Sequence, residues 1–265
     1  MIFLKTDDEI ELLRQSNLLV GKTLAEVAKL IKPGVTTLEL DKVAEEFIRD
    51  NGAIPTFKGY PSPYGGSFPG TLCTSVNSQV VHGIPNNIPL QDGDIVSVDC
   101  GTLLNGFCGD SAYTFCVGEV KPEIRKLLKV TKDSLYLGIQ NAVHGKRLGD
   151  IGYTIQTHCE SNSYGVVREF VGHGIGKEMH EDPQVPNYGK RRSGTILKKG
   201  MCLAIEPMIT MGARQIVMEN DGWTVRTKDR SIAAHFEHTV AVGVGKADIL
   251  SSFEYIEQVL GDNSI

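Results

Sequence analysis

Two apolar segments on either side of Asn105-Gly106 constrain the fold of this 265-residue chain more than any other feature. Residues 94–101 and 106–118 are rich in β-branched, aromatic and other apolar residues. An Asn-Gly pair between two such segments is typical of a two-residue β-hairpin turn. In that register Leu104 pairs with Phe107, and successive side chains alternate between the two faces. The sequence therefore predicts a long antiparallel hairpin.

Capping and breaking signals predict two pairs of helices. Thr6 with Glu9, and Thr36 with Glu39, have the pattern of a capping box, in which the two side chains satisfy the first free amides of a helix. Pro122 suits a first helical position. The predicted helices cover residues 7–31, 37–50, 122–142 and 150–161.

Strands return after the second pair of helices, so the order of elements repeats: two helices, then strands, twice. Residues 34–47 and 145–158 align loosely at an offset of 111 positions, and no polar linker separates the two parts. The sequence therefore predicts an α+β fold with mainly antiparallel strands. We expect a single domain over residues 1–265, with similar halves at about 1–120 and 121–265. The later strands are predicted within residues 201–209, 215–218, 223–227 and 235–243.

Composition excludes several classes of protein. Charged residues make up 22% and hydrophobic residues 41% of the chain, as in ordinary folded proteins. The net charge of −5 argues against a protein that coats nucleic acid. No stretch approaches about 18 apolar residues, the first residues do not resemble a signal peptide, and the six cysteines form no C-x-x-C pair. We therefore expect a protein of the reducing cytoplasm, with no membrane segment and no zinc knuckle.

Two aspartates lie on the predicted hairpin. Asp99 faces Ala112 on the neighbouring strand, and Asp110 lies two residues before Ala112 on the same face. Asp99 and Asp110 are therefore diagonal neighbours, with backbones about 7–8 Å apart. Like charges on one half-buried face repel unless a cation or a proton lies between them. Two solvated carboxylates on an edge hairpin are the alternative. The apolar flanking residues favour an interior position.

The second half of the chain repeats this theme. Glu206 and Glu237 are each embedded in an apolar predicted strand, where an unpaired carboxylate is rare. His173 lies in a glycine-rich loop and adds an imidazole. Four carboxylates and one imidazole suit two divalent ions about 3.5–4 Å apart. The absence of cysteine from this set favours a catalytic site over a structural zinc site.

The motifs around these residues resemble those of the type I methionine aminopeptidases over nearly the whole chain, from about residue 5 to 245. The resemblance implies the pita-bread fold, whose two halves are related by a pseudo-two-fold axis, in a bacterial-style enzyme. The motifs are His82-Gly-Ile-Pro, Val98-Asp99-Cys-Gly, Gly109-Asp110, Gly172-His173-Gly-Ile-Gly, Met179-His180, Ala204-Ile-Glu206-Pro and Phe236-Glu237-His-Thr.

The resemblance also implies a ligand set for two divalent metal ions per chain. Asp110 and Glu237 would bridge both ions, Asp99 would hold one of them, and His173 with Glu206 would hold the other. Carboxylate and imidazole ligands do not distinguish iron, manganese, cobalt or zinc.

The implied reaction is the removal of an N-terminal methionine that precedes a small residue, from nascent polypeptides and short peptides. His82 would contact the substrate near the scissile amide nitrogen, His180 would bind the carbonyl oxygen, and Glu206 would carry the proton to the leaving amine. We expect structural roles for the four remaining histidines. The methionine side chain would bind among Phe57, Tyr60, Phe68, Cys73, Met179 and Trp223.

Part of that pocket departs from the family pattern. Phe57 replaces a frequent cysteine, Phe68 a tyrosine and Met179 an aromatic residue, and the loop at 61–68 is longer than usual. The shape of the methionine pocket is therefore less well defined by the resemblance than the metal site is.

Two other functions compete with this interpretation. A peptidase for proline peptides is disfavoured by Trp223 and by the first 70 residues, which contain two predicted helices and a loop instead of a large domain. A binding protein without activity is disfavoured by the intact ligand set.

Two further patterns concern partners. The glycines around His173 lack the spacing and the strand–helix context of a dinucleotide loop, so no nucleotide cofactor is expected. The basic stretch at 190–199 is interpreted as a solvated loop or, alternatively, as a transient contact with the ribosome. We expect a monomer. The stretch contains Lys190, Arg191, Arg192, Lys198 and Lys199.

Overall fold

The structure is a computed structural model and describes residues 1–62 and 66–265. Its α-helices are α1 (Asp7–Ala28), α2 (Thr37–Asp50), α3 (Pro122–Ile139), α4 (Leu148–Ser161) and α5 (Glu254–Leu260), followed by a short 3₁₀ helix at Gly261–Asn263. The strands of the first half are β1 (Ile54–Pro55), β2 (Leu72–Val76), β3 (Gln79–Val81), β4 (Ile95–Leu104) and β5 (Phe107–Cys116). The later strands are β6 (Gly165–Val166), β7 (Gly172–Gly174), β8 (Glu181–Val185), β9 (Cys202–Ile205), β10 (Met208–Thr210), β11 (Ile216–Met218), β12 (Val225–Thr227), β13 (Ala233–His235), β14 (His238–Ala241) and β15 (Asp248–Ile249).

The predicted hairpin is formed by β4 and β5 in the predicted register. Leu104 pairs with Phe107, and Asp99 pairs with Ala112. The turn residues Asn105 and Gly106 have φ values of 53° and 80°, the positive values that the favoured two-residue hairpin turn requires. Local turn chemistry therefore determines how the two strands align.

The helices begin close to their predicted positions, and two of them end early. The capping boxes at Thr6 and Thr36 form as predicted. Helix α1 ends at Ala28 instead of residue 31, because the chain tightens into three-residue turns before Pro33, where a helical backbone is disfavoured. Helix α3 ends at Ile139 instead of residue 142, again in three-residue turns.

Helix α4 starts two residues earlier than predicted. The Asp150 carboxylate accepts a hydrogen bond from the Arg147 amide at 2.9 Å, so Asp150 is the third residue of the helix and not its first. The bounds of α4 and α2 now differ by 111 positions at both ends, the offset seen in the sequence.

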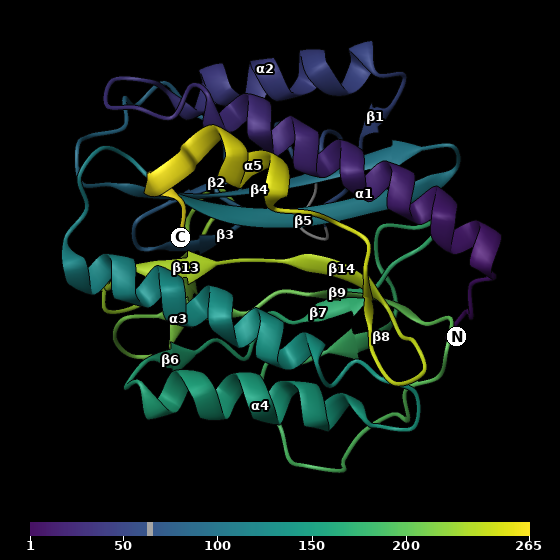
Figure 1. Cartoon of the computed structure of the whole chain (residues 1–265). Helices are drawn as coiled ribbons and strands as arrows, with labels where there is room; N and C mark the ends of the chain where they lie inside the picture. Colours follow the sequence, from purple (N-terminus) through teal and green to yellow (C-terminus); the bar gives the residue numbers. More distant parts are fainter. Residues whose placement is uncertain (63–65) are drawn as a thin grey trace.

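The helices form outer layers over antiparallel strands, which make four sheets in the described ranges (Figure 1). In the first half α1 packs on β4 and β5, and in the second half α3 packs on β9, β10 and β13. Helices α2 and α5 lie against α1, whereas α4 lies against α3. The prediction of an α+β fold with mainly antiparallel strands is confirmed. Across the described ranges, every helix is too short or too polar to cross a bilayer.

Two predicted strands of the second half are interrupted. The segment 201–209 divides into β9 and β10 around Glu206, and the segment 235–243 divides into β13 and β14 around Glu237. The prediction that each glutamate is embedded in a continuous strand is therefore wrong. Because β9 pairs with β14 and β10 pairs with β13, the two interruptions face each other.

One edge of β5 joins the two halves at this level. The Glu237 amide donates to the Ala112 carbonyl at 2.9 Å, and the Thr239 hydroxyl donates to the Asp110 carbonyl at 2.8 Å. The Ser111 hydroxyl donates to the Glu237 carbonyl at 2.7 Å. These bonds account for the loss of regular pairing around Glu237, because its backbone groups bond to β5.

Candidate metal centre

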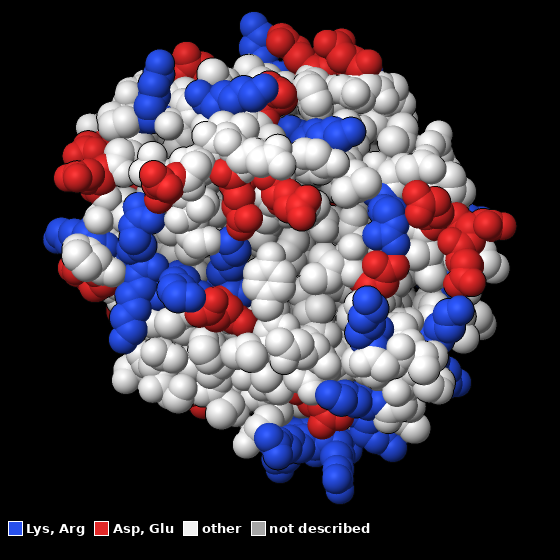
Figure 2. Space-filling model, viewed as in Figure 1, with Lys and Arg blue, Asp and Glu red and all other residues white. Residues whose placement is uncertain are grey.

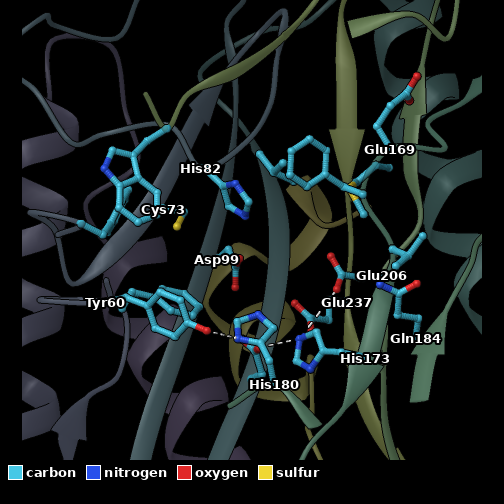
Figure 3. A pocket seen from close by; sticks show the side chains of 18 residues that line it. Tyr60, Cys73, His82, Asp99, Glu169, His173, His180, Gln184, Glu206 and Glu237 are labelled. Carbon is cyan, nitrogen blue, oxygen red and sulfur yellow. Dashed lines mark hydrogen bonds and ion pairs between the residues drawn. The ribbon is translucent and has the colours of Figure 1, made fainter. Parts of the chain in front are cut away.

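A cavity of about 360 Å³ lies between the halves, next to the interrupted strands. Figure 3 shows Asp99 near its middle, with Tyr60 and Cys73 on one side and Glu206 and Glu237 on the other. Among the described residues no lysine or arginine lines it. Its charged and polar lining consists mainly of Asp99, Asp110, Glu169, Glu206 and Glu237 with His82, His173 and His180.

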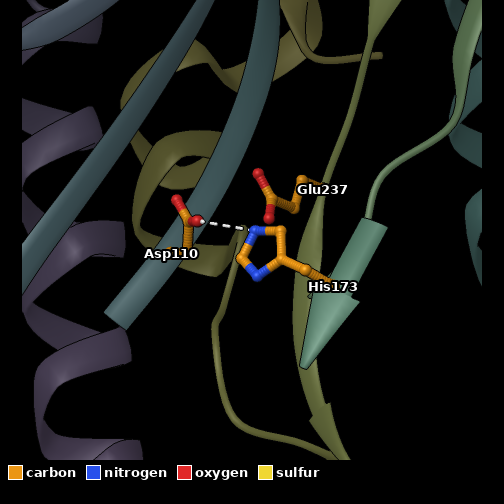
Figure 4. Close-up of side chains that lie close together, drawn as sticks. All are labelled: Asp110, His173 and Glu237. Carbon is orange, nitrogen blue, oxygen red and sulfur yellow. Dashed lines mark ion pairs between the residues drawn. The ribbon is translucent and has the colours of Figure 1, made fainter. Parts of the chain in front are cut away.

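Three side chains form a compact cluster at one end of the cavity (Figure 4). Ligand-type atoms of Asp110, His173 and Glu237 all lie within 4.8 Å of one another, and the three residues are buried. The Nε2 atom of His173 is 3.5 Å from Asp110 Oδ2 and 3.8 Å from Glu206 Oε1. All four residues were predicted from the sequence to share one site, and the fold brings them together.

The Nδ1 atom of His173 lies 2.9 Å from the Gly174 carbonyl oxygen. A carbonyl can only accept, so Nδ1 carries a proton and donates it in this bond. In a neutral ring Nε2 then has a free lone pair directed at the carboxylates. A hydrogen bond of this kind orients most histidines that bind metals.

Several carboxylate oxygens of the site have no hydrogen-bond donor among the described residues. Asp99 Oδ1, Asp110 Oδ1 and Glu237 Oε1 are buried, and each has no hydrogen-bond partner among the described residues. Burial, together with repulsion from neighbouring acids, raises the pKa of Asp99, Asp110 and Glu237. Orphaned buried oxygens are rare and costly. Hard oxygen donors with one imidazole suit divalent cations, so these residues fit a metal site.

Different elements hold the acids in place. Asp99 and Asp110 project from the same face of the β4–β5 hairpin. His173 lies on β7, opposite Ala204 of β9. Glu206 follows β9, and its carbonyl accepts a hydrogen bond from the Asn187 amide group at 2.9 Å. The ligand-type side chains therefore come from both halves of the molecule.

Two other histidines line the cavity outside the cluster. The ring of His82 makes an edge contact with Phe170, with 5.3 Å between ring centroids, and burial lowers the pKa of His82 to about 4. The ring of His180 lies 4.3 Å from that of His173. Burial and the neighbouring His173 lower the pKa of His180 to about 4. Both rings are therefore neutral near pH 7.

The aromatic side chains predicted to bind methionine form one wall of the cavity. Phe57, Tyr60, Phe68, Cys73 and Trp223 line it, and the rings of Phe68 and Trp223 meet edge to face at 5.2 Å. Met179 is buried in the same apolar cluster but does not line the cavity. Instead its side chain packs behind the wall, close to Gly101. Residues 63–65, part of the loop expected to be long, lie outside the described residues.

One histidine beside the cluster, His235, was not predicted to belong to the site. His235 Nε2 is buried 3.5 Å from Glu206 Oε2 and has no hydrogen-bond partner among the described residues. His235 was expected to be structural, although its spacing of two from Glu237 would place both on one face of a strand. By contrast, His238 is held by the Ser251 hydroxyl at 2.7 Å and by the Tyr136 hydroxyl at 3.1 Å. The described lining of the cavity also contains six residues that were not predicted: Val81, Glu169, Phe170, Val171, Gln184 and Met208.

A buried cluster of carboxylates and an imidazole, open to a cavity with two neutral histidines, defines a metal-dependent hydrolase. Comparison with known proteins agrees with this class. Residues 11–243 match the model of metallopeptidase family M24, and the chain belongs to this family.

Its relatives include several bacterial methionine aminopeptidases. The methionine aminopeptidase of Clostridium acetobutylicum is 52% identical over 255 residues, which cover 96% of this chain and 100% of the relative. Methionine aminopeptidase 1 of Bacillus subtilis is 49% identical, with 95% and 99% covered. The resemblance found in the sequence is therefore confirmed.

Solved structures support the fold. The crystal structure of methionine aminopeptidase from Rickettsia prowazekii superposes with a TM-score of 0.92 at 40% identity, covering 95% of this chain and 100% of that one. The prolidase from Pyrococcus horikoshii OT3 superposes with a TM-score of 0.75 at 19% identity and shares the fold. The pita-bread fold implied by the resemblance is confirmed.

Proposed function

We propose that this chain is a methionine aminopeptidase, which removes the N-terminal methionine of nascent proteins and peptides when the next residue is small. The observation that carries this function is the Asp110–His173–Glu237 cluster at one end of a cavity with an aromatic wall. Membership of family M24 implies the use of divalent metal. We further propose that residues 1–265 form a single catalytic domain with two similar halves.

We propose that buried side chains from both halves bind two metal ions. Asp110 and Glu237 would bridge the ions, Asp99 would hold one, and His173 with Glu206 would hold the other. The short distances at His173 and the unpartnered oxygens support this set. Ions held here would polarise the scissile carbonyl and make water a nucleophile near neutral pH.

The protein's own groups would then orient the peptide and move its protons. His180 donates a hydrogen bond to the scissile carbonyl oxygen, His82 lies near the amide nitrogen, and Glu206 carries a proton to the leaving amine. The absence of lysine and arginine from the described lining is compatible with binding of the substrate's free α-amino group at the metal site.

Binding of the methionine side chain is proposed for the aromatic wall. A flexible thioether makes favourable contacts with aromatic rings, and Phe68, Trp223 and Tyr60 provide them beside the cluster. A bulky second residue of the substrate would be hindered by the rings of His82 and Phe170, which are in edge contact where they line the cavity.

Turnover of Met-Ala-Ser, measured together with bound metal before and after chelation, tests the function. We expect turnover that is lost with the metal and restored by its return, and little turnover of Met-Ile-Ser, whose second residue is β-branched. Hydrolysis of Xaa-Pro dipeptides without cleavage of Met-Ala-Ser would favour the proline-peptide alternative. Turnover that survives complete metal removal would contradict the proposal.

We further propose a transient contact with the ribosome, and that the enzyme is a monomer located in the cytoplasm. Figure 2 shows basic side chains gathered at the edge of the molecule beneath α4. Lys190, Arg191 and Arg192 are exposed there, and a groove beside them is lined by Lys146 and Arg147. Phosphate groups are the natural partners of such clustered cations.

Charge reversal separates this contact from catalysis. A variant with Lys190→Glu, Arg191→Glu and Arg192→Glu should cosediment less with ribosomes and turn over tripeptides normally. The matched control is reversal of exposed Lys22 and Lys42 on the α1 and α2 side of the molecule. Unchanged cosedimentation of the first variant would remove the ribosome proposal and leave the aminopeptidase proposal intact.

A further inference from the structure

One hydrogen bond links the aromatic wall to a histidine of the candidate site. The Tyr60 hydroxyl lies 2.8 Å from Nδ1 of His180, and the two rings meet edge to face with centroids 5.3 Å apart. Figure 3 shows the hydroxyl directed at the imidazole across the cavity. The two residues are 120 positions apart in the sequence, so the tertiary structure alone creates the contact.

Both partners are held in place by their own segments. The Tyr60 amide donates to the Phe57 carbonyl at 2.9 Å, and the Phe68 amide donates to the Tyr60 carbonyl at 2.9 Å. His180 directly precedes β8, whose first residue, Glu181, pairs with Gly174 of β7. The hydroxyl and the ring therefore meet from two anchored stretches of backbone.

The chemistry of the pair decides which atom carries the proton. An imidazole is neutral above its ordinary pKa of about 6.5, so at neutral to alkaline pH the Tyr60 phenol faces a neutral ring that has one protonated and one unprotonated nitrogen. A phenol O–H is a stronger hydrogen-bond donor than an imidazole N–H, and an imidazole nitrogen is a stronger acceptor than a phenol oxygen. The hydroxyl therefore donates to Nδ1, and the single ring proton is on Nε2.

We infer that Tyr60 is a positioning residue that fixes His180 as the tautomer with a proton on Nε2, so that this nitrogen presents a hydrogen-bond donor to the scissile carbonyl oxygen. The inference deepens the proposed function and rests on it for the identity of the acceptor.

The neighbouring His173 shows the opposite arrangement. Its Nδ1 donates to the Gly174 carbonyl and leaves a lone pair on Nε2, which suits a cation. His180, with its ring 4.3 Å away, bonds through Nδ1 to a hydroxyl that can donate. Two adjacent imidazoles thus acquire different functions at Nε2, because a carbonyl faces one Nδ1 and a hydroxyl faces the other.

The first test reads the tautomer directly. Ring ¹⁵N chemical shifts separate protonated from unprotonated nitrogens, and Zn²⁺-loaded protein suits the measurement because Zn²⁺ is d¹⁰ and diamagnetic. We expect protonated Nε2 in the wild type and a mixture of tautomers in Tyr60→Phe. Tyr153→Phe, which removes a hydroxyl outside the cavity, is the matched control and should match the wild type. A wild-type His180 protonated at Nδ1 would overturn the inference.

The second test separates positioning from substrate binding. Loss of one neutral hydrogen bond should lower kcat of Tyr60→Phe on Met-Ala-Ser about three- to tenfold with KM nearly unchanged. The phenyl ring remains in the wall, so the preference for methionine over norleucine should also persist. A loss confined to KM, or an altered preference between these side chains, would show that the hydroxyl serves the pocket and would overturn the inference.

A double-mutant cycle tests whether Tyr60 acts through His180. His180→Ala should lower kcat by about 10²–10³, the range for losing one donor to the carbonyl oxygen, while metal content stays unchanged. Adding Tyr60→Phe to His180→Ala should then have no further effect, because the hydroxyl acts only through the ring. Additive losses would overturn the inference. If the wild type failed to cleave methionyl peptides, the proposed function would fall, whereas the ¹⁵N measurement would still decide the role of Tyr60.

Discussion

The two strand pairs that supply the acidic side chains are built differently. Asp99 and Asp110 lie on the β4–β5 hairpin, which is paired without a break from Ile95 and Cys116 to its turn. Glu206 and Glu237 lie where both strands of the second pair are interrupted at the same level. The continuous hairpin directs its side chains by simple alternation, whereas the interrupted pair depends on other contacts.

Those contacts come largely from the first half of the molecule. The Glu237 amide and carbonyl bond to Ala112 and Ser111 of β5. Glu237 is therefore held in place by the hairpin, whereas the Glu206 carbonyl bonds to Asn187 of the second half. The continuous hairpin therefore carries two of the acids and positions a third, Glu237.

The largest expected effect comes from a bridging acid of the hairpin. Asp110→Asn keeps the shape of the side chain but removes its charge, and we expect loss of activity and of both metal ions. Asp99→Asn, on the same hairpin, should lose one ion only. Elemental analysis and turnover of Met-Ala-Ser measure both. Two ions per chain in Asp110→Asn would contradict the assigned bridge.

A smaller effect is expected at the junction between the halves. Thr239→Val removes the buried hydroxyl that donates to the Asp110 carbonyl, which should lower the free energy of unfolding by about 1–2 kcal/mol. It should also weaken metal binding about tenfold, because a support of the site is lost.

The control for this change lies on the outer side of the hairpin. Ser16→Ala removes a buried hydroxyl that bonds to Thr102 at 2.8 Å, and it should lower stability similarly without changing metal affinity. Equal weakening of metal binding in Thr239→Val and Ser16→Ala would show that the interrupted pair has no special dependence on the junction.

The next prediction concerns His238, the first residue of β14, and the pH dependence of the free energy of unfolding. Burial lowers the pKa of His238 to about 3, below the ordinary value of 6.5, so the folded state keeps this ring neutral. The contribution of neutral His238 to the free energy of unfolding is therefore complete above pH 6.5, and it is lost as the pH falls from 6.5 towards 3.

Between pH 7.5 and 5.5 we expect the wild type to lose about 1 kcal/mol of unfolding free energy through this group. His238→Asn should show a correspondingly shallower loss in denaturant titrations at the two pH values. His82 and His180, whose pKa values are also lowered, contribute equally to both proteins and do not affect the difference. Identical losses in the two proteins would exclude His238 as the source.

The smallest effect is expected at the turn of the hairpin. Gly106 has a φ of 80°, and Gly106→Ala should lower the free energy of unfolding by about 1 kcal/mol or less. The added methyl group meets nothing within 4 Å, so the penalty is one of backbone conformation. Metal content should not change. A loss of metal would show that the register of the strands had shifted.

Local signals in the sequence determined the hairpin and the starts of the helices. The Asn105-Gly106 turn and the capping boxes act between residues a few positions apart, so their hydrogen bonds form whatever surrounds them. The relation between Asp99 and Asp110 follows from that register. Glu206, Glu237 and His173 were indicated by their apolar or glycine-rich surroundings, and the resemblance to a known family then assigned them as ligands.

Only the tertiary structure decided how the second pair of acids is presented. The junction with β5 joins residues more than a hundred positions apart, such as Thr239 and Asp110, and no local pattern encodes it. No local pattern encodes the contact of His235 with Glu206 or that of Tyr60 with His180 either. A sequence specifies which side chains can bind a metal or hold a proton, but their partners are chosen by packing, because hydrogen bonds and buried charges depend on what the fold places within a few ångströms.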